Sequence, residues 1–348
     1  MTKNLIDTLS DLCALHGPSG DEKLVAEYLY ERAKPHADEI RFDGIGNLFV
    51  FKKGKKAGKP AMICAHMDEV GFIVRAITSD GLLKIDTLGG IDRRVILGRC
   101  VRVLGKNGFV PGVIGLTPTH LASDDAKKTP PKMESITIDI GASSKEEALE
   151  LVSLGDSVSF VTEPALFGNG CFKGKAIDDR VGCAVLLSLI ESEEQPEKDT
   201  WFVFTVQEEV GGRGATVASF AVDPAQALIL EGTTAADIAG VSGEQRVCIV
   251  GEGAVISYMD RSTIYDPAMF RSLSDYAEES NIAWQVKTLV AGGTDAGRVH
   301  VARAGIPCAG LAVPVRYIHA PVSVVSIADI ERMQQLAMAF MTGKAVEL

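Results

Sequence analysis

The first stretch of the chain, residues 1–71, begins with helical periodicity and then becomes extended. Ser19 and Glu22 have the spacing of a capping box at the start of a helix that would end near Lys34. Its apolar residues would share one helical face: Leu24, Val25, Tyr28 and Leu29. An apolar run at 61–65 predicts a buried strand that ends at His66.

The second stretch, residues 72–162, changes to short strands separated by turns. An Asp-Gly pair at 80–81 and an Asn-Gly pair at 107–108 each stand between two apolar runs, which predicts two β-hairpins. We expect this block to be a small β domain inserted into a catalytic α/β domain made of residues 1–71 and 163–348.

The third stretch alternates strands and helices. Fully apolar runs predict buried strands at 201–206, 227–230 and 307–314. Asp266 and Ser326 each stand at the expected N-cap of a helix. The predicted fold class is therefore α/β, with a mostly parallel central sheet, helices on both faces and the small β domain as an insertion.

Composition narrows the class of protein. The 348 residues suit about two domains, and 46% are hydrophobic while 23% are charged, as in a folded globular protein. The net charge of −11 argues against a nucleic-acid partner, because a duplex-binding face must be basic. No apolar run approaches the roughly 20 residues of a membrane span, and the N-terminus reads as an amphipathic helix instead of a signal peptide.

Cysteine usage indicates a reducing compartment. The seven cysteines are scattered and form no CxxC pair. Together with the absence of an export signal, this pattern predicts a cytoplasmic protein with free thiols and no membrane partner.

Six residues with metal-binding or acid–base chemistry follow an apolar strand or begin a helix: His66, Asp178, Glu208, Glu209, Glu231 and His319. Ligands of open α/β sheets bind beyond the carboxyl ends of the strands. These residues therefore converge on one edge if the strand order permits. Alone, each also fits a structural role, such as a helix cap for Asp178 or the end of a strand for Glu231.

Together these side chains have a coherent chemistry. Zinc, cobalt and manganese all accept imidazole nitrogen and carboxylate oxygen. Two histidines and three carboxylates are enough for two ions that share one carboxylate, and such a pair activates a water. One of the two adjacent glutamates would remain free as a general base.

Six ordered motifs resemble the tetrahedral-type aminopeptidases of metallopeptidase family M42. They are AHMDEVG at 65–71, KAIDDRVG at 175–182, QEEVGGRGA at 207–215, ILEGTTAAD at 229–237, GGTDAG at 292–297 and PVRYIHAP at 314–321. The resemblance covers nearly the whole chain. The family includes glutamyl, leucyl and lysyl aminopeptidases, and some members are labelled endoglucanases.

The resemblance implies a centre of two divalent metal ions, zinc or cobalt, with manganese also fitting. His66 and Glu231 would bind one ion, Glu209 and His319 the other, and Asp178 would bridge them. The commonest family pattern has Asp where this chain has Glu231, and the extra methylene changes the reach of this ligand.

The resemblance also implies roles for four residues around the metals. Glu208 would be the general base, and Asp68 would orient the imidazole of His66. Thr294 and Asp295, in GGTDAG, would line the substrate pocket, although a glycine-rich turn that caps a helix fits them equally well.

Short peptides are the implied substrates, and residues 72–162 would mediate dimerisation and assembly into a homo-oligomeric dodecamer. Three other functions are open: a two-metal deacylase of N-acylated amino acids, a non-catalytic assembly protein, and a glycosidase. The glutamate at position 231, in place of the commoner aspartate, is the feature that favours the deacylase. Glycoside hydrolysis normally uses two carboxylates without a metal pair, so it leaves both histidines unexplained.

Overall fold

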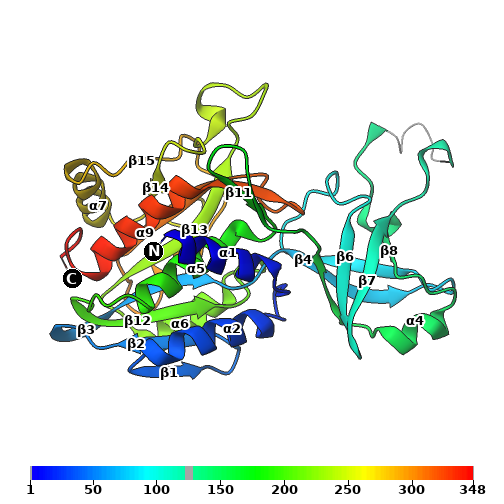
Figure 1. Cartoon of the computed structure of the whole chain (residues 1–348), viewed down its shortest axis with the longest axis horizontal. Helices are drawn as coiled ribbons and strands as arrows, with labels where there is room; N and C mark the ends of the chain where they lie inside the picture. The colour runs from blue at the N-terminus through cyan, green and yellow to red at the C-terminus, as the bar shows by residue number, and fades with distance from the viewer. Residues whose placement is uncertain (1, 122–127, 348) are drawn as a thin grey trace.

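The computed structural model describes residues 2–121 and 128–347, which form an α/β domain and a smaller β-barrel joined at one end (Figure 1). The chain leaves the α/β domain just after His66, builds the barrel and returns before residue 165. Among the described residues, no helix is long and apolar enough to cross a membrane.

The α/β domain is built on an 11-stranded sheet with the order β1-β2-β12-β3-β13-β16-β17-β11-β10, to which β14 and β15 are added beside β16. Its strands are β1 Glu39–Phe42, β2 Leu48–Lys52, β3 Lys56–His66, β10 Ala165–Phe167, β11 Cys171–Gly174, β12 Lys198–Thr205, β13 Gln226–Ala235, β14 Ala254–Ser257, β15 Trp284–Gln285, β16 Cys308–Arg316 and β17 Ser323–Ser326.

The sheet is mixed. The central run β12-β3-β13-β16 is parallel, whereas β2 and β17 join its two ends antiparallel. The α/β class is confirmed, but a mostly parallel sheet is not: the parallel pairs are those of these four strands and the short pair β14-β15. Some outer strands form antiparallel hairpins, such as β1-β2 and β10-β11. Strands paired in this way need no crossover helix between them.

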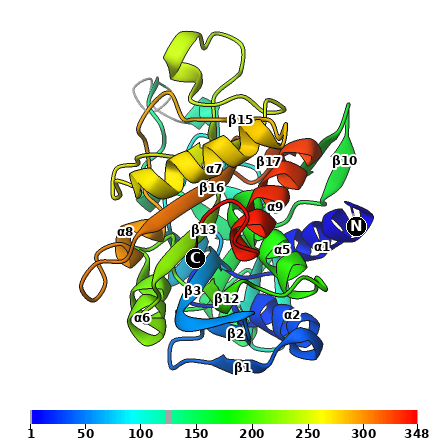
Figure 2. The same ribbon diagram turned by 90° about the vertical axis from the view of Figure 1, so that its left-hand side faces the viewer.

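Helices cover both faces of the sheet (Figure 2). They are α1 Thr2–Ala14, α2 Lys23–Ala33, α5 Ile177–Ile190, α6 Arg213–Val222, α7 Pro267–Glu279, α8 Ala296–Val299 and α9 Ile327–Met341, with 3-10 turns η1 Lys34–His36 and η4 Gly243–Arg246. Successive residues of β3 point to opposite faces. Ile63 and Ala65 pack in the core that contains α5 and α9, while Met62 and Cys64 pack with α6 and α8.

The inserted domain is a closed barrel with the strand order β4-β5-β8-β7-β6-β9. Its elements are β4 Gly71–Ile77, β5 Leu83–Leu88, β6 Cys100–Gly105, β7 Gly108–Gly115, η2 Thr119–Leu121, η3 Met133–Ser135, β8 Thr137–Asp139, α4 Lys145–Leu151 and β9 Ser157–Phe160. Both predicted hairpins are present, as β4-β5 and β6-β7. The barrel has its own apolar core, in which Phe72 and Phe160 make an edge-to-face contact with ring centres 5.4 Å apart.

Two of the predicted helix caps are wrong. Helix α2 begins after Glu22 without a side-chain cap, and Ser19 instead donates a 2.6 Å hydrogen bond to Asp68 Oδ2. Asp68 is fully buried, so its carboxylate needs hydrogen-bond donors, and Ser19 supplies one of them. Ser326 precedes α9 but makes no side-chain cap, whereas Asp266 caps α7 as predicted.

Candidate metal centre

The candidate ligands meet at the carboxyl edge of the parallel strands. His66 is the last residue of β3, and Glu231 lies within the neighbouring strand β13. Glu208 and Glu209 follow β12, His319 follows β16, and Asp178 lies at the start of α5, which packs against β3 and β13. Parallel strands end at the same edge of a sheet, which is why residues so far apart in sequence become neighbours.

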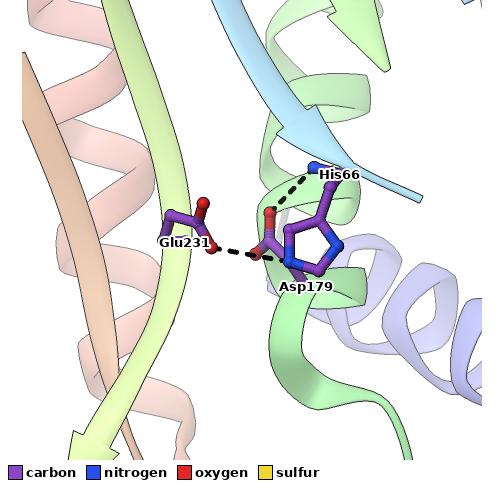
Figure 3. Close-up of side chains that lie close together, drawn as sticks. All are labelled: His66, Asp179 and Glu231. Carbon is purple, nitrogen blue, oxygen red and sulfur yellow. Dashed lines mark hydrogen bonds and ion pairs between the residues drawn. The ribbon is translucent and has the colours of Figure 1, made fainter. Parts of the chain in front are cut away.

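One side of the centre contains His66, Asp179 and Glu231 (Figure 3). His66 Nε2 lies 3.6 Å from Glu231 Oε2. Asp179 is turned toward the backbone, where its carboxylate accepts hydrogen bonds from the amides of His66 (3.2 Å) and Gly182 (2.9 Å). Asp179 therefore ties α5 to the end of β3, while Glu231 faces the imidazole.

Asp178 lies between the two imidazoles. Its Oδ1 is 3.4 Å from His66 Nε2, and its Oδ2 is 3.4 Å from His319 Nε2. His319 Nε2 is also 3.4 Å from Glu209 Oε2. Within the described residues, the buried atoms Asp178 Oδ1 and Glu209 Oε1 have no hydrogen-bond partner. Unpartnered buried carboxylate oxygens beside imidazole nitrogens are what a divalent cation would satisfy, so the residues present fit a metal centre.

Asp68 is a buried residue that supports the centre through hydrogen bonds. Its Oδ1 accepts a 2.9 Å hydrogen bond from the amide of Glu208, and its Oδ2 accepts a 3.1 Å bond from the amide of Glu209. The same carboxylate lies 3.4 Å from His66 Nδ1. The backbone carbonyl of Asp68 also lies 3.1 Å from His66 Nδ1, in hydrogen-bond contact. Asp68 thus orients the His66 ring, with Nε2 toward Asp178, and its side chain holds the loop that carries the paired glutamates.

The pKa values reflect a crowded acidic site. Burial raises the pKa of Glu209 to about 8 and the pKa values of Glu208 and Glu231 well above the usual range. Burial alone would lower the pKa of His319, but Asp178 and Glu209 raise it to about 9. Without a cation these groups hold protons in place of it, and metal binding would release them.

A cleft of about 500 Å³ opens beside the paired glutamates and is lined by Glu208, Thr294 and Arg298, among others. Asp295, the neighbour of Thr294, points inward: it is 1% exposed and accepts a 2.6 Å hydrogen bond from Thr205 Oγ1. Of the two residues expected to line a substrate pocket, the structure places Thr294 at the cleft and Asp295 behind it.

The loop after β5 of the barrel lies next to the centre and contacts it through its backbone. Gly89 and Gly90 follow β5, and Gly89 has a φ of +83°. A Cβ atom on Gly89 would lie 3.1 Å from Glu209 Cβ and 2.8 Å from Val70 Cγ1. A Cβ on Gly90 would lie 3.7 Å from His319 Nδ1. The barrel loop therefore covers the Glu209–His319 side of the site.

Comparison with known proteins identifies the family. A sequence model described as M42 glutamyl aminopeptidase matches residues 46–336, most of the chain. The chain belongs to the M42 peptidase family. This confirms the family, the hydrolase class and the aminopeptidase function that the motifs imply.

Relatives match this M42 peptidase over nearly its full length. The glutamyl aminopeptidase of Lactococcus lactis is 33% identical and covers 99% of this chain and 97% of its own. A solved aminopeptidase from the archaeon Desulfurococcus kamchatkensis is 35% identical, with a TM-score of 0.93, over 98% of this chain and 95% of that chain. The Pyrococcus horikoshii TET1 peptidase, which assembles into a tetrahedron or an octahedral shell, is 33% identical with a TM-score of 0.87, over 99% and 100%.

Sequence reasoning missed a buried ion cluster next to the centre of this M42 peptidase. Lys175 Nζ lies 2.7 Å from Glu69 Oε2, and Arg180 Nη2 lies 3.4 Å from Glu69 Oε1. Arg180 also donates to the carbonyl of Met67 at 2.8 Å, so the cluster supports the segment that follows His66. All three residues lie inside the motifs AHMDEVG and KAIDDRVG. Their charged side chains next to candidate metal ligands were the sequence signal that could have revealed the cluster.

Proposed function

We propose that the chain is a two-metal aminopeptidase that removes N-terminal residues from short peptides. The observation that carries the proposal is Asp178, which lies between His66 and His319 with one buried oxygen unpartnered. Such a carboxylate is suited to bridge two cations and has no evident structural use.

The proposed ligands are His66 with Glu231 for one ion, His319 with Glu209 for the other, and Asp178 for both. When bound, two divalent cations would supply a water of lowered pKa and would polarise the scissile carbonyl. The nitrogen and oxygen donor set suits zinc or cobalt, and also manganese.

Glu208 is the proposed general base. Its side chain lines the open cleft, and its backbone amide is held by Asp68. In this role the carboxylate would take a proton from water and pass it to the leaving amine. The acidic surroundings would also attract the free α-amino group of the substrate.

A homo-oligomer is the proposed state, with the barrel of residues 72–162 as the dimerisation unit and a dodecamer as the final assembly. The shell formed by the P. horikoshii relative supports this proposal, as do exposed apolar side chains on the barrel, which include Leu121, Leu154 and Val161. Light scattering at micromolar concentration with metal present should give a mass of a dimer or larger, and a monomer would contradict the proposal.

A cytoplasmic location also remains a proposal. All seven cysteines are free thiols, and five of them are buried. This usage is typical of proteins kept in a reducing compartment.

Initial rates on metal-reconstituted protein test the activity. The panel contains peptides with a free amino terminus, the same peptides acetylated, and cellulose. Hydrolysis of the free peptides only, lost on chelation and restored by zinc or cobalt, is the expected result. Hydrolysis of the acetylated series alone would indicate a deacylase, and release of sugar from cellulose would indicate a glycosidase.

A further inference from the structure

The loop that carries the paired glutamates is held by its backbone amides. Four consecutive amides, those of residues 206–209, each donate a hydrogen bond to a side-chain oxygen. The acceptors are Asn47 Oδ1 at 3.0 Å, Glu22 Oε1 at 3.1 Å and the two oxygens of Asp68 at 2.9 and 3.1 Å. All three acceptor residues are buried. Together they fix the path of a loop that belongs to no strand or helix.

Glu22 is the acceptor with the least evident local use. It lies outside the six sequence motifs, directly before α2, and is 5% exposed. Its Oε1 also accepts a 2.8 Å hydrogen bond from the amide of Gly20. Burial, followed by the negative charge of Asp68, raises the pKa of Glu22 to about 7. The fold therefore keeps an acidic side chain where its charge is disfavoured, and this side chain bonds the amide of Gln207.

Gln207 is the residue at which the chain turns from β12 toward the centre. Its φ of +57° lies in the left-handed region, which is disfavoured for a residue with a Cβ atom. Such a conformation persists only where surrounding contacts hold it, and Glu22 supplies one of them. The two residues that follow have different supports. Glu209 is also anchored by its contact with His319, whereas Glu208 faces the cleft and depends on the backbone for its direction.

We infer that Glu22 is a positioning residue for the general base. Its carboxylate holds Gln207 in the left-handed conformation, and this turn directs Glu208 toward the cleft. The inference rests on the proposed role of Glu208. Without the Glu22 oxygen, the amide of Gln207 would lose its acceptor and the turn would relax. The bonds to Asn47 and Asp68 would still hold the rest of the loop, so the defect should appear in kcat and not in metal binding.

The first test measures kcat, KM and metal content in Glu22→Ala, Glu22→Gln and the matched control Glu31→Ala, an exposed position on α2. Glu22→Ala should lower kcat about 30-fold and leave KM within about twofold, with unchanged metal content. Glu22→Gln keeps an oxygen acceptor for the two amides, so kcat should return to within about threefold of the wild-type value. Glu31→Ala should change nothing. A wild-type kcat in Glu22→Ala would overturn the inference.

A double variant shows whether Glu22 acts through Glu208. When Glu22→Ala is added to Glu208→Gln, kcat should fall no further than it does in Glu208→Gln alone, because the misplaced side chain no longer serves as a base. A residue that only stabilised the fold would lower kcat in both backgrounds. A double variant whose loss equals the product of the two single losses would therefore contradict the inference.

Hydrogen exchange separates this inference from the proposed function. In metal-loaded Glu22→Ala, the amides of residues 206–209 should exchange about 10-fold faster than in the wild type, while those of the barrel core keep the wild-type rate. Faster exchange supports the inference even if no peptide is hydrolysed, in which case the proposed function fails alone. Unchanged exchange would overturn the inference. If Glu22→Ala does not fold, Glu22→Asp replaces it: the charge and a good helix start are kept, but the shorter side chain should cause the same two changes.

Discussion

The carboxyl edge of the α/β sheet and the core of the barrel are built in opposite ways. At the sheet edge, Asp178 and Glu209 keep buried oxygens without partners, and several carboxyls crowd two imidazoles. The barrel core is apolar, with residues such as Phe72 and Ile138 fully buried. The edge therefore leaves buried polar atoms that a bound cation could satisfy, whereas the interior of the barrel is filled by apolar side chains.

The two regions also touch in different ways. The α/β domain offers charged side chains to the centre, and the barrel offers the backbone of Gly89 and Gly90. A site can therefore depend on a domain that contributes backbone but no side chain to it. Four experiments test this contrast.

Glu208→Gln should have the largest effect. The amide keeps the shape of the side chain but cannot take up a proton, so kcat should fall about 10³-fold. Metal content, measured by elemental analysis, and the thermal midpoint should stay close to the wild-type values. Near-normal turnover would remove Glu208 from the mechanism, and the exposed Glu163→Gln serves as the matched control.

Gly89→Ala tests the contribution of the barrel. The new methyl group would press on Glu209 and Val70 from a backbone with positive φ, so Glu209 must move and kcat/KM should fall about 100-fold. Gly98→Ala is the control, since Gly98 also has a positive φ but open space around its Cβ. Equal losses in both variants would mean that backbone strain, and not the contact with Glu209, causes the effect.

The stability of the metal-free protein should fall as pH rises from about 5 to about 9. The folded pKa values of Glu209 (about 8) and His319 (about 9) lie above their ordinary values, so the folded state keeps protons that the unfolded chain has already lost. Thermal unfolding with chelator at several pH values measures this slope.

Metal should flatten this slope, because the cation replaces the protons. Glu209→Gln should also reduce it in the metal-free protein. A metal-free stability that rises across the same pH window would contradict the assignment of raised pKa values to the centre.

Ser19→Ala should have the smallest effect. It removes one donor to Asp68, while the amide of Glu209 still bonds the same oxygen. We expect a loss of about 1 kcal/mol in the free energy of unfolding and a fall in kcat/KM of about threefold to tenfold. Ser135→Ala, at an exposed serine of the barrel, should change neither quantity. An unchanged Ser19→Ala enzyme would show that Asp68 needs no third donor.

Much of the fold follows from sequence pattern. Apolar runs predict the central strands, and the Asp-Gly and Asn-Gly turns predict both barrel hairpins. The antiparallel flanks of the sheet were not predictable, because the order and direction of strands depend on contacts between distant segments.

The candidate site, too, is only partly predictable from the sequence. Motifs identify His66, Asp178 and Glu231, but pattern cannot show that Asp295 points inward or that Ser19 serves Asp68 and not a helix end. Gly89 carries no local signal either. Its position beside the centre follows only from the tertiary placement of the barrel loop after β5.

The spread of the candidate ligands along the chain, from His66 to His319, has a consequence for biosynthesis. His66, Asp178 and Glu231 have been synthesised after about two thirds of the chain, whereas His319 follows 88 residues after Glu231. A product that ends before residue 319 lacks one of the two imidazoles of the proposed centre. Under the proposed function, such an unfinished chain would have no peptidase activity.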